Sequence, residues 1–165
     1  MEYKNIFITG ATGVVGKPLL QKLINNNHNI YALARSEETM KDLTDLGVSP
    51  IKGDLFESSL YDQLQDAKID AIFHVAGMNK MCAKNPEAMF NINIEGTKKM
   101  LGLGNSLGIK KFIYTSSAVT LGEEKDYRET KRQHIEVVFL VIMKSQDTKQ
   151  KLRPLSLRKS LSLYQ

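Results

Sequence analysis

The stretch Ile6-Phe7-Ile8-Thr9-Gly10-Ala11-Thr12-Gly13-Val14-Val15-Gly16 decides how the rest of the chain can fold. It begins as an apolar strand, passes through three glycines in the spacing G-x-x-G-x-x-G, and continues into a helical pattern. Such a turn lets backbone N–H groups approach a pyrophosphate and points a helix N-terminus at it. We therefore predict a phosphate-binding turn built from Gly10, Thr12, Gly13, Val14, Val15 and Gly16.

The same unit of strand followed by helix repeats along the chain. Apolar runs and turn residues predict strands at 3–9, 30–34, 48–52, 70–77 and 111–117, and helices at 14–27, 37–46, 58–67 and 86–107. Buried strands that alternate with helices are typical of a parallel sheet with right-handed crossovers. The predicted fold class is α/β, a doubly wound parallel sheet in three layers (α/β/α).

The basic charge of the chain lies in its last part. The net charge is +5 over 165 residues. Residues 1–129 carry 15 Lys/Arg and 16 Asp/Glu, whereas residues 130–165 carry 8 Lys/Arg and 2 Asp/Glu. We divide the chain into a domain at 1–129 and an atypical basic tail at 130–165, which we do not expect to be a native domain. The tail has no nucleic-acid motif, so we expect no nucleic-acid partner.

Composition indicates a soluble protein of a reducing compartment. No apolar run is long enough to span a membrane, and the N-terminus enters a strand directly, so we expect neither a membrane segment nor a signal peptide. The single Cys82 cannot form an internal disulfide, which favours a cytoplasmic location. Cys82 and His74 are too sparse for a metal site, and His74 is expected to be a hydrogen-bonded core histidine.

Ligands of doubly wound sheets bind at the carboxyl ends of the strands, and five predicted strand ends carry polar or glycine-rich residues. At the end of the second strand, NAD-binding folds usually place an acid that binds the ribose 2′-OH. At the end of the strand predicted at 30–34, this chain has Ala34 and Arg35, and no carboxylate before Glu37. An arginine can instead bind a 2′-phosphate, which favours NADP and leaves NAD possible. The alternative is that Arg35 is a solvated loop cation.

Four other candidate residues each allow two interpretations, two at predicted strand ends and two in the helix predicted at 86–107. Asp54 either accepts from an adenine amino group, with Leu55 packed on the ring, or caps the next helix. One of Asn91 and Asn93, which sit poorly in a helix, either bonds backbone near the cofactor or faces solvent. Ser117, after Ser116, either hydrogen-bonds a substrate oxygen or is an ordinary turn residue.

Together these segments resemble the extended short-chain dehydrogenase/reductase family, in the branch similar to dihydroflavonol 4-reductase. The matching segments are Thr9–Gly16, Gly53-Asp54-Leu55, His74-Val75-Ala76-Gly77, Asn93-Ile94-Glu95-Gly96-Thr97 and Tyr114–Gly122. The resemblance implies a Rossmann domain that binds NAD(P). It also implies that Gly10, Gly13 and Gly16 line the pyrophosphate, that Asp54 and Leu55 meet adenine, that Val75, Ala76, Gly77 and Asn93 flank the ribose and diphosphate, and that Ser117 is catalytic.

The family's Tyr-x-x-x-Lys pair is not where the resemblance requires it. In the family the tyrosine follows the serine by about 25 residues, on a long helix, and its phenol passes a proton. Here Tyr127-Arg128-Glu129-Thr130-Lys131 fits the pattern only 10 residues after Ser117 and has loop character. We therefore do not assign these residues as the catalytic pair.

From about residue 131 the composition of the chain changes: no glycine follows Gly122, and an apolar run is followed by a basic tail rich in Leu and Ser. We hypothesise that the coding frame slipped near Thr130–Lys131. Codons for residues 130–146 read in a shifted frame permit a product with N-Y-E-K-S, which resembles the family's active-site helix. The sheet would then be incomplete at its C-terminal side. The apolar run Val137–Met143 would either add a strand or remain a misfit patch.

The sequence therefore predicts the dinucleotide-binding part of an NADP(H)-preferring reductase or epimerase. The substrate of an intact relative would carry a hydroxyl or ketone and be sugar- or polyphenol-like, and the chain as translated is expected to be inactive. One alternative is a non-catalytic NADP(H) sensor module. The other is a live enzyme that uses Tyr127 and Lys131.

Overall fold

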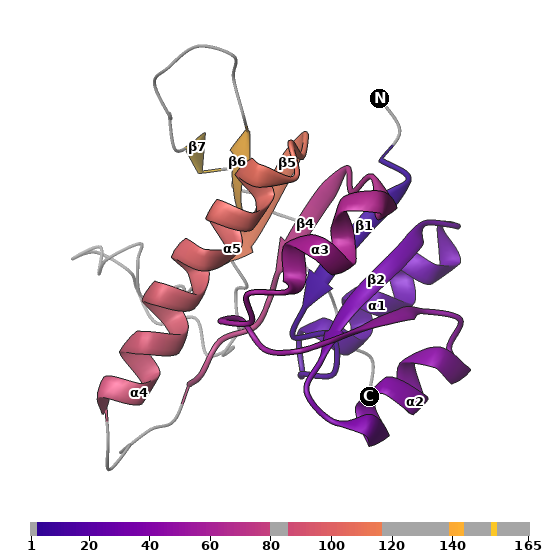
Figure 1. Ribbon diagram of the computed structural model, residues 1–165, viewed down its shortest axis with the longest axis horizontal. Helices are drawn as coiled ribbons and strands as arrows, with labels where there is room; N and C mark the ends of the chain where they lie inside the picture. The colour runs from indigo at the N-terminus through magenta and orange to yellow at the C-terminus, as the bar shows by residue number, and fades with distance from the viewer. Residues whose placement is uncertain (1–2, 80–85, 117–138, 144–152, 155–165) are drawn as a thin grey trace, which may run out of the picture.

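A computed structural model of the protein describes residues 3–79, 86–116, 139–143 and 153–154 (Figure 1). In chain order the elements are β1 (Asn5–Thr9), α1 (Gly16–Asn25), β2 (Asn29–Ala34), α2 (Glu37–Asp45), β3 (Ser49–Lys52), α3 (Leu60–Leu64), η1 (Gln65–Ala67), β4 (Ala71–His74), α4 (Pro86–Phe90), η2 (Asn91–Glu95), α5 (Gly96–Ser106), β5 (Lys111–Thr115), β6 (Phe139–Met143) and β7 (Arg153–Pro154). Nine predicted elements are thus present, with most ends shifted by a few residues.

The strands form one sheet in the order β3-β2-β1-β4-β5-β6-β7. The first five are parallel, and their order is that of a Rossmann sheet, which confirms the predicted fold class. The β6 strand pairs with β5 in the antiparallel direction, with Lys111 opposite Met143 and Thr115 opposite Phe139. Most of the 137–143 run therefore adds a strand, at an edge where an antiparallel neighbour needs no crossover helix.

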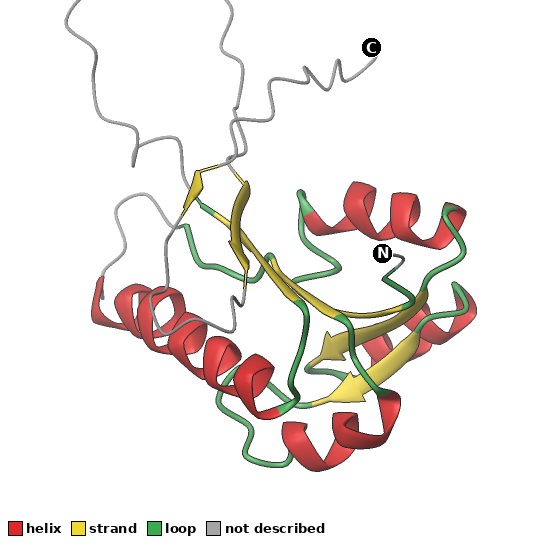
Figure 2. Ribbon diagram, turned by 90° about the horizontal axis from the view of Figure 1, so that it is seen from above, coloured by secondary structure: helices red, strands yellow, loops and turns green. Residues whose placement is uncertain are grey.

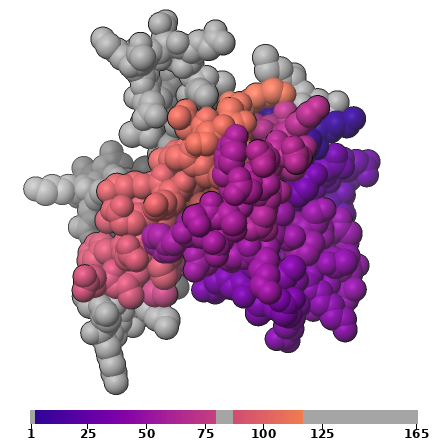
Figure 3. Space-filling view, viewed as in Figure 1, coloured from indigo at the N-terminus to yellow at the C-terminus, as the bar shows by residue number. Residues whose placement is uncertain are grey.

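Helices cover both faces of the sheet, because the central strand is apolar on both sides. In β1, Ile6 and Ile8 belong to the core packed under α1 and α2, whereas Phe7 belongs to the core under α3 and α5. All three side chains are at most 2% exposed. Figure 2 shows the sheet between helices on either side, and Figure 3 shows residues coloured from indigo to orange packed into one continuous body. The three-layer prediction is confirmed.

The helix predicted at 86–107 is interrupted by a π turn. The α4 and α5 segments are joined by η2, in which the Gly96 N–H bonds to the Asn91 carbonyl, five residues earlier. Asn93 lies in this wider turn and its side-chain amide bonds outside the helix. Periodicity alone predicted a regular helix because it carries no information on this tertiary contact.

The Asp70 carboxylate bonds neighbouring segments at the amino-terminal edge of the sheet. Its Oδ2 accepts from the backbone N–H groups of Lys4 and Asn5, at 2.9 and 3.1 Å, and its Oδ1 pairs with Lys110 Nζ. The hydrogen bond from Lys110 is the largest cause that lowers the pKa of Asp70 to about 2. One carboxylate thus joins β1, β4 and the turn before β5.

Candidate dinucleotide site

Gly10 and Gly16 are glycines because the fold leaves no room for a side chain. Gly10 has a φ of +73°, and a Cβ there would lie 2.6 Å from the Ala76 nitrogen. A Cβ on Gly16, where α1 begins, would lie 1.9 Å from the Gly10 carbonyl oxygen. The turn therefore packs against the exit of β4 on one side and folds back on itself on the other.

Gly13 is different, because the protein itself leaves space beside it. A Cβ there would meet the Gly10 oxygen at 3.4 Å, which is ordinary contact. Thr12, Gly13 and Val14 are exposed, and Val14 is 94% exposed at the tip of the turn. Val15, half-buried, precedes α1, and no side chain caps this helix, whereas the Ser36 hydroxyl caps α2. The open face of the turn combines a glycine that packing does not explain with an uncapped helix start.

The exit of β4 lies beside this turn. The Val75 N–H bonds to the Thr9 carbonyl at 3.2 Å, and Ala76 follows, half-buried, before the exposed Gly77. Across from it, the Asn93 Oδ1 accepts from the Met78 N–H at 2.8 Å and the Asn93 Nδ2 donates to the Met78 carbonyl at 2.9 Å. Of the two alternatives for the asparagines, backbone bonding is correct for Asn93, while Asn91 is exposed.

His74 is a satisfied core histidine, as predicted. It is 0% exposed, its Nδ1 lies 2.7 Å from Thr9 Oγ1, and its Nε2 lies 3.1 Å from Thr97 Oγ1. Burial lowers the pKa of His74 to about 4, so the ring is neutral at pH 7. Within the described residues, no group of three His, Cys, Asp or Glu side chains could hold a metal ion.

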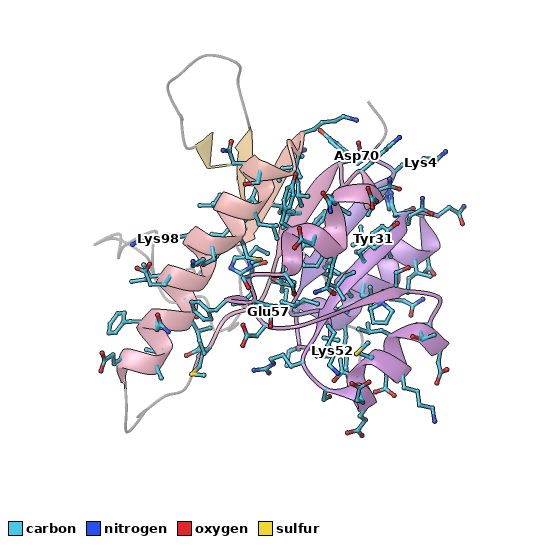
Figure 4. All side chains as sticks on the ribbon, in the orientation of Figure 1. Lys4, Tyr31, Lys52, Glu57, Asp70 and Lys98 are labelled. Atoms are coloured by element: carbon cyan, nitrogen blue, oxygen red, sulfur yellow. The ribbon has the colours of Figure 1, made fainter. Side chains whose placement is uncertain are left out.

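The ends of β2 and β3 form an open pocket of about 580 Å³. Its walls are Arg35, Lys52, Gly53, Asp54, Glu57, Ser59 and Gln63. The ends are held together by the bond from the Gly53 N–H to the Ala34 carbonyl, at 3.0 Å. Figure 4 places Lys52 and Glu57 near this end of the molecule and Lys4 and Asp70 at the opposite end. The pocket therefore brings Arg35 and Asp54 together with a second cation.

Lys52 is the residue that sequence reasoning missed. It pairs with Glu37, and this hydrogen bond raises the pKa of the Lys52 ammonium. The first carboxylate after β2 is thus already engaged by a cation from the neighbouring strand. The signal in the sequence was a lysine at the end of a predicted strand, but its meaning depends on β3 lying next to β2.

Asp54 and Leu55 follow β3 as predicted, in different environments. The Asp54 Oδ1 accepts from the Phe56 N–H at 2.7 Å, so the carboxylate caps a tight turn, while α3 begins only at Leu60 after Ser59. Of the two interpretations of Asp54, the helix cap is therefore wrong, because the chain makes an extra turn before α3. Leu55 is 8% exposed and packs on Gly96, where an added Cβ would lie 2.8 Å from Leu55 Cδ1.

The structure does not describe four residues that the sequence singled out. Ser117, Tyr127, Lys131 and Cys82 lie beyond the described ranges. The described chain reaches Ser116 at the end of β5. The predictions on those four residues remain predictions.

These observations define a Rossmann domain whose candidate site lies along one edge of the sheet. The glycine turn, the exit of β4 and the pocket at β2 and β3 all follow carboxyl ends of parallel strands, where such folds bind nucleotides. The open Gly13 fits a pyrophosphate, because a ligand that needs close backbone contact requires a glycine there. In the described residues no helix is long and apolar enough to cross a membrane.

Comparison with known proteins agrees with this class. The model of the NAD dependent epimerase/dehydratase family matches residues 6–137, and the chain belongs to that family. A protein of Synechocystis sp. that carries the provisional name dihydroflavonol 4-reductase is 32% identical over 120 residues, which are 73% of this chain and 34% of the relative. A sterol-4-alpha-carboxylate 3-dehydrogenase (decarboxylating) of Dictyostelium discoideum is 28% identical over 126 residues, 73% of this chain and 38% of the relative.

Solved structures give the same fold. The crystal structure of the protein gox2253 superposes with a TM-score of 0.62 and 30% identity, covering 74% of this chain and 37% of that one. The chain thus spans a little more than a third of the length of each of these three relatives. The family and fold are established for this chain, whereas the activity of a whole relative is not carried over with them.

Proposed function

We propose that this chain binds a nicotinamide dinucleotide at the carboxyl edge of its sheet, with NADP(H) preferred over NAD(H). The observation that carries the proposal is the contrast among the three glycines. Packing within the protein explains Gly10 and Gly16, but a side chain at Gly13 would meet nothing closer than 3.4 Å. A glycine that the fold does not need is explained by close approach of a pyrophosphate.

The preference for NADP(H) rests on the charges in the β2–β3 pocket. Arg35 is exposed there beside Lys52. Glu37, the first acid after β2, is paired with Lys52 and so is engaged before any ribose 2′-OH could use it. A 2′-phosphate could pair with Arg35 and draw Lys52 from Glu37, whereas a 2′-OH would share the Glu37 carboxylate with Lys52.

Each remaining residue of the site has a binding role in this proposal. The dinucleotide would lie with its diphosphate on Gly10–Gly16, its adenine near Asp54 and Leu55, and one ribose near Val75–Gly77 and Asn93. Bound nicotinamide would supply hydride chemistry.

Ser117 would orient a substrate oxygen in an intact reductase or epimerase that acts on a sugar- or polyphenol-like hydroxyl or ketone. Tyr127 and Lys131 follow Ser117 too closely for the family's proton carrier, so we propose that this chain binds without turnover.

Calorimetric titration of the full chain with NADPH and with NADH tests the binding. We expect saturable binding with NADPH the tighter ligand. Gly13→Val should weaken both ligands by roughly tenfold or more, because its side chain occupies the pyrophosphate path. Arg35→Ala should weaken NADPH by about tenfold, the value of one charge-assisted hydrogen bond, and leave NADH nearly unchanged. Lys22→Ala, at an exposed lysine at the far end of α1, is the control.

Two outcomes would overturn the proposal. Absence of binding at millimolar concentrations of both dinucleotides contradicts the site itself. Equal loss of NADPH and NADH affinity in Arg35→Ala contradicts the 2′-phosphate assignment alone. The absence of turnover is tested separately: ketone reduction by the full chain that disappears in Tyr127→Phe would show a live enzyme instead.

A further inference from the structure

The feature that the binding proposal leaves unused is a buried chain of hydrogen bonds through His74. In the part of the chain that the structure describes, Thr9 and His74 are the fully buried polar residues, both 0% exposed. They lie opposite each other in the register of β1 and β4. The His74 ring also stacks on Tyr114 of β5, with centroids 5.7 Å apart. A polar pair at the centre of an apolar sheet is costly unless every group is bonded.

The direction of each bond fixes the form of the ring. The Thr97 hydroxyl donates to the Asn93 carbonyl at 2.6 Å, so its one proton is used. His74 Nε2 lies 3.1 Å from the Thr97 hydroxyl oxygen, so it must be the donor to that oxygen. In the neutral ring Nδ1 is consequently the acceptor, and the Thr9 hydroxyl donates to it at 2.7 Å. Of the two neutral tautomers, only the one with its proton on Nε2 satisfies both neighbours.

One end of the chain of bonds reaches the glycine turn. Thr9 Oγ1, having donated to His74, accepts from the Ala76 N–H at 3.3 Å. That same nitrogen is the atom that lies 2.6 Å from a hypothetical Cβ on Gly10. The position of Ala76 therefore sets the gap between the exit of β4 and the first glycine.

The other end reaches the π turn. The Asn93 carbonyl accepts a hydrogen bond from the Thr97 hydroxyl, and the Asn93 side-chain amide makes two hydrogen bonds to the Met78 backbone. Both the backbone and the side chain of Asn93, which lies in the η2 turn, are therefore hydrogen-bonded. The exit of β4 is thus bonded at Ala76 to Thr9, a direct partner of His74. At Met78 it is bonded to Asn93, whose carbonyl accepts from Thr97, the other partner of His74.

We propose that His74, as the neutral Nε2–H form, is a positioning residue that sets the glycine turn, the exit of β4 and the Asn93 turn relative to one another. The proposal rests on the proposed function in one respect, namely that these three segments face the dinucleotide. His74 itself lies in the core and is not a binding residue. Its effect on binding is through Ala76, Met78 and Asn93.

The ring form is tested directly in the unmodified full chain. Long-range ¹H–¹⁵N spectra distinguish a protonated Nε2 from a protonated Nδ1. We expect Nε2 to carry the proton at pH 7. A proton on Nδ1, or a charged ring, would overturn the proposal without any variant having to fold.

The coupling is tested by Thr9→Val and Thr97→Val, which keep the shape and remove one hydroxyl each. Amide hydrogen exchange should speed up at Ala76 in the first variant and at Met78 in the second. Thr115→Val is the matched control, because the Thr115 hydroxyl is buried without a hydrogen-bond partner among the described residues. Unchanged exchange in both test variants, or the same change in the control, contradicts the coupling.

Two substitutions at position 74 separate the two ends. His74→Asn places an amide oxygen near the Nδ1 position and keeps an acceptor for Thr9, whereas His74→Gln places an amide N–H near the Nε2 position and keeps a donor for Thr97. Each should restore exchange protection at its own end relative to His74→Leu. Identical behaviour of the Asn and Gln variants would contradict a two-ended role.

Binding of NADPH distinguishes this proposal from the proposed function. Each threonine variant should weaken NADPH by roughly twofold to tenfold, the effect of one hydrogen bond. If the unmodified chain binds NADPH and the variants bind equally well, the positioning role fails and the proposed function stands. If the unmodified chain binds no dinucleotide while the tautomer and exchange results hold, the proposed function fails and the His74 coupling stands.

Discussion

A Cβ atom placed on Gly16 would lie 1.9 Å from the carbonyl oxygen of Gly10, so the two outer glycines of the turn are in direct backbone contact. The neighbour is a backbone atom that the strand β1 and the Ala76 contact hold in place. The turn can therefore accept a substitution there only by moving the start of α1 or the end of β1.

Gly16→Ala is expected to destabilise the chain by about 3 kcal/mol, at the upper end of overpacking effects. Chemical denaturation monitored by circular dichroism measures the change. Gly102→Ala is the matched control, because Gly102 is an exposed glycine within α5 and a Cβ there meets nothing within 4 Å. It should stabilise the helix by about 0.5–1 kcal/mol. Equal effects of the two substitutions would contradict the packing role of Gly16.

Asp70 makes stability depend on acid pH. Because the folded-state pKa is lowered from 3.8 to about 2, the stabilisation is complete above pH 3.8 and is lost as pH falls toward 2. We expect Asp70→Asn to cost on the order of 2 kcal/mol at pH 7 and close to nothing near pH 2. Urea denaturation at several pH values checks this.

Asp42→Asn, at an exposed residue of α2, is the control for that experiment. It should leave stability unchanged within about 0.5 kcal/mol across the pH range, as surface substitutions usually do. A cost in Asp70→Asn that persists undiminished at pH 2 would mean that packing, and not the bonds to Lys4, Asn5 and Lys110, supports this edge.

Much of the fold followed from local pattern. Runs such as Ile6–Thr9 are apolar on both faces and bounded by turn residues, so buried parallel strands were predictable without knowing their neighbours. The outcome at His74 was likewise predictable, because a lone histidine in a buried strand must be neutral and bonded.

Other features depend on tertiary neighbours that sequence does not display. The π turn exists where Asn93 bonds Met78, and the role of Lys52 depends on β3 lying beside β2. The direction of β6 is decided by pairing with the edge of β5, since an apolar run fits a strand in either direction. Asp54 does not cap α3, because the chain inserts a turn before that helix.

The Lys52–Glu37 pair is expected to influence the choice between dinucleotides. Lys52→Met removes a cation from the pocket and frees the Glu37 carboxylate for a ribose 2′-OH. Exposed ion pairs contribute about 0.2–1 kcal/mol each, so the NADPH to NADH affinity ratio should fall by roughly 1.4-fold to fivefold. Calorimetric titration with both ligands measures the ratio.

Lys41→Met controls for the change in net charge, because Lys41 is also an exposed lysine but lies in α2. A ratio that moves equally in both variants would indicate a general electrostatic effect. In that case Lys52 would have no specific part in cofactor choice.

The reciprocal bonds between Asn93 and Met78 predict an unusual pH response for Asn93→Asp. A carboxylate can still accept from the Met78 N–H, but its second oxygen then faces the Met78 carbonyl oxygen, where the amide donated at 2.9 Å. We expect a loss of about 1–3 kcal/mol at pH 7, the cost of an unsatisfied pair of acceptors. The protonated acid can donate to that carbonyl, so the substituted carboxyl should have a raised pKa. Its stabilising contact is present below the unfolded-state pKa and is lost as pH rises through the folded-state pKa.

The variant should therefore recover stability relative to the unmodified chain as pH falls below that raised pKa. Asn91→Asp supplies the control, because Asn91 is exposed in the same π turn and adds the same charge to the same helix. Urea denaturation between pH 4 and pH 8 measures the stability of both variants. This range begins at the ordinary pKa of a carboxyl group, about 4, and extends above it to cover a raised pKa. If Asn93→Asp and Asn91→Asp follow the same pH curve, the charge on the helix accounts for the effect and the grip of Asn93 on Met78 does not hold the π turn to β4.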